Sequence, residues 1–223
     1  MSAESTPDRI LATALRLFNS NGVDRVAIYK IASDLGISPG NLTYHFAKKQ
    51  DIIYSLIDRL EIEAAEVLTT PRNPGAKHLA GYMVNLFSLM WRYHFFFESL
   101  TYFTATDPHL AESYRRIMHT AIGGSVQRIE NAIACGDIEP MKAPNSPKIL
   151  GENMWAVWVN RLGAARSSLD ETSDGVAAIY DCCVHHISLI QPYASNSYVA
   201  RLHEAVKDLL DVDQDSVARQ ATG

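Results

Sequence analysis

The stretch from Ser38 to Lys49 brings amide, hydroxyl, phenol and ammonium groups together within twelve residues. Amides, hydroxyls and phenols can hydrogen-bond to base edges in a major groove, whereas ammonium groups bind phosphates. These residue types therefore predict a DNA-binding surface, to which we expect the preceding Ala27 and Tyr29 to contribute. The complete expected set is Ala27, Tyr29, Ser38, Pro39, Gly40, Asn41, Thr43, Tyr44, His45, Lys48 and Lys49.

Two short helices are expected to position these groups. The first has an apolar face at helical spacing and is followed by Gly36, which suits the left-handed end of a helix. Ser38 can cap the second helix, and Pro39 suits its first turn, where no amide donor is needed. The apolar residues are Ile28, Ile31, Ala32 and Leu35 in the first helix, and Leu42 and Phe46 in the second.

A third helix begins near Lys48 and Lys49. A phosphate at its start would meet both ammonium groups and unpaired backbone amides. Two helices joined by a glycine-containing turn also occur in many proteins that never touch DNA. The turn by itself therefore leaves the function open.

Residues 9–53 as a whole resemble the DNA-binding domain of the TetR family of bacterial transcriptional regulators. The matching segments are RILATALRLF, NGV, IASDLGISPGNLTYHF and KKQDII. The residues that fit the family pattern are Ile31-Ala32, Gly36-Ile37-Ser38, Gly40, Leu42, Tyr44, Phe46 and Lys49. The resemblance implies a homodimeric helix-turn-helix protein that binds a palindromic operator and responds to a small molecule.

Two positions depart from the family pattern. Val26-Ala27 stand where Thr or Ser often caps the first of the two helices, and a lost cap costs on the order of 1 kcal/mol. Thr43-Tyr44 stand where the family favours two adjacent aromatic residues. Thr43 could contact a base or a thymine methyl group instead of a phosphate.

The charge is distributed unevenly along the 223 residues, whose net charge is −5. Residues 1–60 hold seven basic and six acidic residues, and the remainder holds thirteen basic and nineteen acidic ones. The first block is therefore +1 and the rest −6. A nearly neutral DNA-binding block on an acidic body is compatible with specific binding and predicts modest non-specific affinity.

The long segments are helical in pattern, and we expect an all-α protein with a helix-turn-helix domain and a larger helical domain. The first domain spans residues 1–53 with a connecting helix at 51–68, and the break TPRNPG follows. A ligand-binding and dimerisation domain is expected over 69–211, with a flexible tail at 212–223. Its expected helices cover residues 76–94, 107–135, 147–168, 175–190 and 197–210, and a first helix covers 6–19.

The compartment is expected to be the cytoplasm. The first eight residues are polar, no apolar run is long enough to cross a bilayer, and three cysteines form no disulfide framework. Cys182 and His186 lie one helical turn apart, but a structural zinc site needs four ligands and no second pair has a recognised spacing. We expect no metal and no cofactor.

Aromatic residues and methionines crowd the segment from Met83 to Phe103. Most of them would pack a helical core, but such residues also line ligand cavities between helices. The family resemblance implies an inducer pocket in this half, which would prefer an apolar or aromatic molecule with one polar group. Its expected residues are Phe87, Met90, Trp91, His94, Phe103, His119, Trp155 and Arg161.

The resemblance also implies a dimer interface built from the helices at 147–168 and 175–190. The residues expected there are Trp155, Val159, Leu162, Val176, Ile179, Cys183, Ile187 and Ile190. Two other hypotheses stay open: a helical protein-interaction module that has lost DNA binding, and an enzyme. The enzyme is the weakest, because the sequence has no G-x-S-x-G, glycine-rich phosphate loop or H-E-x-x-H motif.

Overall fold

A computed structural model describes residues 5–69, 73–168 and 175–211, except for the side chains of 69 and 162–168. Within these ranges the chain is helical and forms no strand beyond one isolated bridge between Ile138 and Ala194. The expected all-α fold is confirmed. The chain divides into two compact units, residues 1–63 with 92–115 and residues 64–91 with 116–223.

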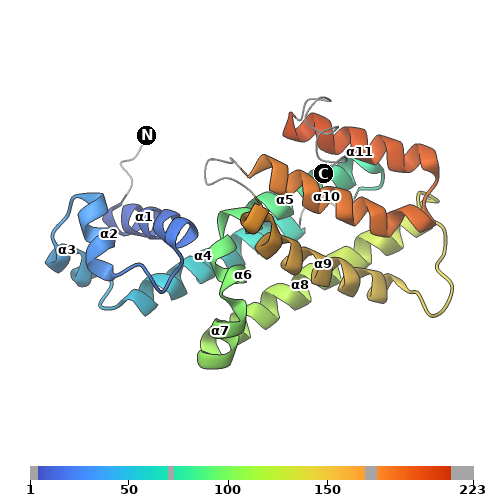
Figure 1. Ribbon diagram of the computed structural model, residues 1–223. Coiled ribbons are helices and arrows are strands. Elements are labelled where there is room, and N and C mark those ends of the chain that lie inside the picture. Colours follow the sequence, from blue (N-terminus) through green and yellow to red (C-terminus); the bar gives the residue numbers. More distant parts are fainter. Residues whose placement is uncertain (1–4, 70–72, 169–174, 212–223) are drawn as a thin grey trace. The chain divides into compact units, whose positions relative to one another are not determined.

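The helices of the first unit begin with α1 (Thr6–Asn21), α2 (Ile28–Leu35) and α3 (Pro39–His45) (Figure 1). The first part of α4 (Lys49–Thr69), α6 (His94–Glu98), α7 (Leu100–Thr106) and the start of α8 (Pro108–Ala134) complete it. Ser5 caps α1: its hydroxyl accepts from the Asp8 amide. Helix bounds lie within two residues of the expected ones, but residues 94–106 form two helices separated at Ser99.

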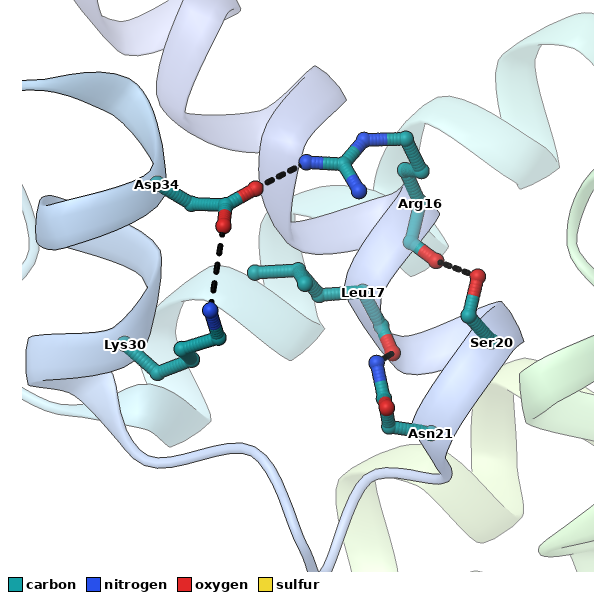
Figure 2. A network of polar contacts seen from close by, with 6 residues as sticks. All are labelled: Arg16, Leu17, Ser20, Asn21, Lys30 and Asp34. Carbon is teal, nitrogen blue, oxygen red and sulfur yellow. Dashed lines mark hydrogen bonds and ion pairs between the residues drawn. The ribbon is translucent and has the colours of Figure 1, made fainter.

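Ion pairs join the helices of the first unit at its surface. Figure 2 shows Asp34 of α2 between Arg16 of α1 and Lys30, whose ammonium lies 3.2 Å from the carboxylate. Arg59 of α4 pairs in the same way with Asp8 of α1. Beneath these pairs α1 buries the apolar face that its sequence predicts, including Ile10, Ala14, Leu17 and Phe18.

Residues 92–115 belong to the first unit because α6 packs against α1. The Asn19 side chain donates to the Arg92 carbonyl at 2.7 Å and accepts from the Phe95 amide at 3.1 Å. The Phe95 ring lies 5.5 Å from that of Phe18. The expected division along the sequence placed this segment with the second half, because a packing partner far away in sequence leaves no local signal.

The second unit contains α5 (Ala76–Arg92), most of α8, α9 (Pro147–Ser168), α10 (Val176–Ile190), the 3₁₀ helix η1 (Gln191–Tyr193) and α11 (Asn196–Leu210). α10 packs against both α9 and α11 (Figure 1). Aromatic contacts form the centre of this core: the Trp158 ring lies 5.5 Å from Phe87 and 4.9 Å from Trp155.

Candidate DNA-binding surface and effector cavity

The helix α3 is held in place by its cap and by two apolar side chains. The Ser38 hydroxyl accepts from the Asn41 amide at 3.1 Å, and Pro39 occupies the first turn, as the sequence predicts. Leu42 is fully buried and Phe46 is 9% exposed. A helix of seven residues is unstable by itself, so this packing against the unit determines its position.

The turn before α3 is also as expected. Gly36 adopts the left-handed conformation with φ 72°, and its amide donates to carbonyls at the end of α2. At the other end of α2, Ala27 is the N-cap and supplies no side-chain hydrogen bond. The departure from the family pattern therefore leaves this helix start without a side-chain cap.

The exposed side of α3 holds the expected contact residues. Tyr44 is 86% exposed and Tyr29 of α2 is 67% exposed. The Thr43 hydroxyl donates within its own helix, to the Pro39 carbonyl at 3.1 Å and the Gly40 carbonyl at 3.2 Å. Of the other expected residues, Ser38, Asn41 and Lys48 are exposed with Pro39 and Gly40, and Ala27, His45 and Lys49 are half-buried.

The two lysines at the start of α4 differ from each other. The Lys49 ammonium donates to the Val23 carbonyl at 2.9 Å and so ties α4 to the segment between α1 and α2. The Lys48 side chain is exposed, but its amide donates to Asp51 at 3.0 Å. The expectation of unpaired backbone amides here does not hold for Lys48, whose amide donates to Asp51, and the Lys49 ammonium has a hydrogen bond within the fold.

A hydrogen-bonded cluster joins the start of α4 to the start of α8. The Tyr54 hydroxyl donates to Asp107 at 2.8 Å, and the Gln50 amide donates to the same carboxylate. Asp107 also accepts from the backbone amides of His109 and Leu110, so it caps α8. Burial raises the pKa of Asp107, but these hydrogen bonds, led by that of Tyr54, lower it below its ordinary value.

An apolar cavity lies within the second unit, between α5, α8, α9 and α10. Its volume, counted as the space that the centre of a water molecule can reach, is about 40 Å³, which holds a few waters. The lining residues are Leu79, Tyr82, Met83, Leu86, Phe87, Ala121, Ile122, Ser125, Arg128, Ile129, Ala132, Ile138, Gly151, Met154, Trp155, Trp158, His186 and Ile190.

Only two residues of the expected ligand set, Phe87 and Trp155, line this cavity. Met90 is buried without lining it, and Trp91 packs against Gly175, where an added Cβ would clash with the indole ring. Aromatic clustering in the sequence could not separate these positions, because cavity walls and solid core share the same residue types.

The polar residues of the expected ligand set, His94, His119 and Arg161, are not among the residues that line the cavity. His94 belongs to the first unit, where its Nε2 lies 3.3 Å from the Asn19 carbonyl oxygen. His119 is exposed, and Arg161 pairs with Asp181, with its Nε 2.9 Å from the carboxylate. Phe103, also in the first unit, stacks on Phe96 at 5.8 Å.

The polar lining residues that the sequence analysis missed are Tyr82, Ser125, Arg128 and His186. The His186 Nδ1–H donates to the Cys182 carbonyl at 3.1 Å, and its ring lies 4.7 Å from Phe87. Burial lowers the pKa of His186 to about 4, so the ring is neutral at neutral pH. Ser125 and Arg128 are three residues apart on α8, a spacing that could have indicated a shared polar face.

The cysteines of α10 are buried in the core. Burial raises the pKa of Cys182 to about 12 and that of Cys183 further above its ordinary value. Among the described residues, no three His, Cys, Asp or Glu side chains gather where they could hold one ion. In the same part of the chain, no helix has the length and apolar character needed to span a membrane.

Two family models match this chain. One, for bacterial regulatory proteins of the tetR family, matches residues 10–56, and the other, for a bacterial transcriptional repressor, matches residues 59–202. The second match alone covers more than half of the chain. The chain belongs to the TetR family. This confirms the resemblance of residues 9–53 and extends it to the second half.

Similar proteins agree with this assignment. An HTH-type transcriptional regulator of Staphylococcus aureus (strain USA300) is 39% identical over 57 residues, 26% of this chain and 31% of that protein. The chain thus matches about a third of the length of such curated relatives. The crystal structure of a TetR-family transcriptional regulator from Marinobacter aquaeolei VT8 is 27% identical with a TM-score of 0.78, covering 93% of this chain and 98% of that one.

More distant structures share the fold. Mycobacterium smegmatis AmtR is 18% identical with a TM-score of 0.60, covering 96% of this chain and 98% of that one. The ketosteroid transcriptional regulator KstR2 of Mycobacterium tuberculosis is 14% identical with a TM-score of 0.63, covering 87% of this chain and 98% of that one. At such identities the likeness concerns the fold alone.

The residues expected at a TetR-family dimer interface divide by exposure. Ile179, Cys183, Ile187, Ile190 and Trp155 are buried in the chain's own core, because α10 packs against α9 and α11 at once. Val159 and Val176 are half-buried, and the Leu162 side chain lies outside the described residues. Among the described large apolar side chains of α9 and α10, the exposed ones are Ile149, at 39%, and Val184, at 36%. An interface on these helices has to use the exposed residues.

Proposed function

We propose that this TetR-family chain is a transcriptional repressor that binds a palindromic operator as a homodimer and leaves it when a small effector binds. The observation that carries the proposal is the exposed side of α3. Asn41 and Tyr44 project from a helix that Ser38 caps and Leu42 holds. Contact groups on a rigidly held helix can meet base edges without a further ordering cost.

Dimerisation follows from the size of α3. Seven residues supply only a few base contacts, so useful affinity needs two such helices on two half-sites. We propose that α9 and α10 form the twofold contact through their exposed residues Ile149, Ala156 and Val184 and through the half-buried Ala177. Short side chains such as Ala156 and Ala177 would permit close approach of the helices.

Release from DNA requires that the effector bind the non-DNA-binding arrangement better, since only differential affinity shifts an equilibrium. The connecting helix α4 is the first candidate for transmitting the effector signal, because it continues from the start near Lys49 into the second half of the chain. The structure adds a second candidate, α8, which follows Asp107, bonded to Gln50 and Tyr54, and lines the cavity about four to seven turns later. We propose that both α4 and α8 transmit the effector signal.

A gel-shift with the DNA that flanks the chain's own gene tests DNA binding. Asn41→Ala should relax the sequence preference by about 1–3 kcal/mol at the contacted base pair. Tyr44→Ala should weaken operator binding without loss of helix content, because the side chain is 86% exposed. Tyr102→Ala removes another exposed tyrosine, on α7, and should bind like the wild type.

Equal affinity of the wild type and both α3 variants would move the contact surface elsewhere. Failure of the folded wild type to shift this DNA, together with a random-sequence selection that yields no site, would refute the DNA-binding proposal. A helical interaction module would give this last result.

A further inference from the structure

Among the described residues that line the effector cavity, most are apolar and one, Arg128, is a cation. Most of these described lining residues are aliphatic, aromatic or methionine, and none of them is Asp or Glu. The exceptions are Tyr82, Ser125, Arg128 and His186. Because the buried His186 is neutral, Arg128 is the lining residue that carries charge at neutral pH. A guanidinium in such a wall favours a negatively charged group on any molecule that enters.

The structure holds the Arg128 guanidinium in a defined place. Its central carbon lies 3.6 Å from the centroid of the Tyr82 ring, and its Nη1 donates to the Gly124 carbonyl at 3.2 Å. A planar group fixed on an aromatic face loses little further freedom when it binds a carboxylate. Ser125, one turn earlier on α8, adds a hydroxyl to the same wall.

A smaller, more polar cavity adjoins the apolar one. The two share Leu79, Arg128 and Ala132 as lining residues. His78 and Asn131 also line the smaller cavity, and none of the described residues around it is Asp or Glu. Arg128 therefore stands at the boundary between an apolar space and a polar one. A molecule that spans this boundary has an apolar body and a polar head.

The apolar cavity must widen to admit such a body, because it holds only a few waters as it stands. Met83 and Met154 both line it. Methionine side chains have three rotatable bonds and adapt their packing easily. An unbranched alkyl chain needs less displacement of the wall than a wide ring system, which favours a slender body.

We propose that the effector is an amphiphilic carboxylate, whose alkyl body fills the apolar cavity and whose head pairs with Arg128 and the Ser125 hydroxyl. The inference rests on the proposed effector role of this cavity and specifies its ligand. A carboxylate accepts two parallel hydrogen bonds from a guanidinium, whereas an ester or alcohol of the same chain makes only neutral ones. Charge should therefore decide affinity.

Decanoate, methyl decanoate and decanol are matched probes of this proposal. Trp155 and Trp158 line the cavity, so tryptophan fluorescence reports binding. Calorimetry measures the same affinities independently. Decanoate should bind the full chain at least about tenfold more tightly than either uncharged probe. Arg128→Gln should remove that preference, and Arg128→Lys should retain part of it because the charge remains.

Arg201→Gln is the matched control. Arg201 of α11 is exposed and lies 5.9 Å from the Tyr198 ring, and it lines neither of these two cavities. This variant should bind decanoate like the wild type. Circular dichroism establishes that each variant is folded. If Arg128→Gln is unfolded, Ser125→Ala takes its place, with an expected loss of severalfold in decanoate affinity and little change for decanol.

Equal affinity for decanoate and decanol, or binding of none of the three probes, would overturn the proposal. So would an unchanged preference for decanoate in folded Arg128→Gln. Operator binding by the ligand-free protein is measured separately in the gel-shift. If the protein binds its operator but not decanoate, the carboxylate proposal fails and the proposed function stands. If it binds decanoate but no DNA, the proposed function fails and the ligand assignment of the cavity stands.

Discussion

Two substitutions three residues apart on α10 separate folding from assembly. Ile187 is 6% exposed and packs in the chain's own core, whereas Val184 is 36% exposed. Burial of an isoleucine side chain contributes about 1.5–3 kcal/mol, and a buried unpaired carboxylate costs several kcal/mol. Ile187→Glu should therefore remove about 5 kcal/mol or more, a large share of the 5–15 kcal/mol that stabilises a domain.

Val184→Glu should leave the single chain folded, since an exposed substitution changes stability by less than about 1 kcal/mol. In a twofold dimer the change occurs twice at one interface. If the two carboxylates together cost about 4 kcal/mol, the dimer weakens by roughly a thousandfold. Leu209→Glu on α11, where the side chain is 54% exposed, is the control that should leave the dimer intact.

Light scattering measures the mass, urea unfolding measures the stability, and a gel-shift measures operator binding. We expect Val184→Glu to be a folded monomer with little operator affinity and Ile187→Glu to be unfolded or nearly so. A dimeric Val184→Glu would place the interface elsewhere. A stable, folded Ile187→Glu would contradict the packing of α10 described above.

Two further predictions concern pH and salt. Because the folded pKa of His186, about 4, lies below its unfolded value of 6.5, the unfolded chain binds the proton first. The free energy of unfolding should stay constant above pH 6.5 and decrease as the pH falls from 6.5 to 4. His186→Leu should flatten this part of the plot of urea midpoint against pH. An unchanged slope in the variant would exclude His186 as the source of the decrease. Lys48→Ala should reduce the slope of log affinity for the operator against log salt concentration by about one. Lys49→Ala should instead lower the free energy of unfolding by roughly 1 kcal/mol, since the Lys49 ammonium binds the Val23 carbonyl. Equal effects of the two variants on the salt dependence would argue against this distinction.

The DNA-binding part could be predicted from sequence because its signals are local. The left-handed Gly36, the cap from Ser38, Pro39 in the first turn and the buried Leu42 all lie within seven residues. Backbone preferences and short-range hydrogen bonds determine these features, so they depend little on the rest of the fold. The family match has the same origin.

The second half resisted prediction for two physical reasons. α10 is apolar around most of its circumference and packs on two neighbours, so periodicity could not assign Ile187 to the core and Val184 to the surface. Aromatic residues fill solid core and line cavities alike, so the sequence could not distinguish Trp155, which lines the cavity, from Trp91, which does not.

The amino-acid sequence by itself determined the helix-turn-helix, the all-α class and the helix bounds to within two residues, since turns, caps and helical period are encoded in neighbouring residues. Only the tertiary structure decided that Lys49 bonds to Val23, that residues 92–115 join the first unit and that Arg128 enters the cavity wall. Each of these depends on which distant segments meet, and this follows from the packing of the whole chain rather than from any local pattern.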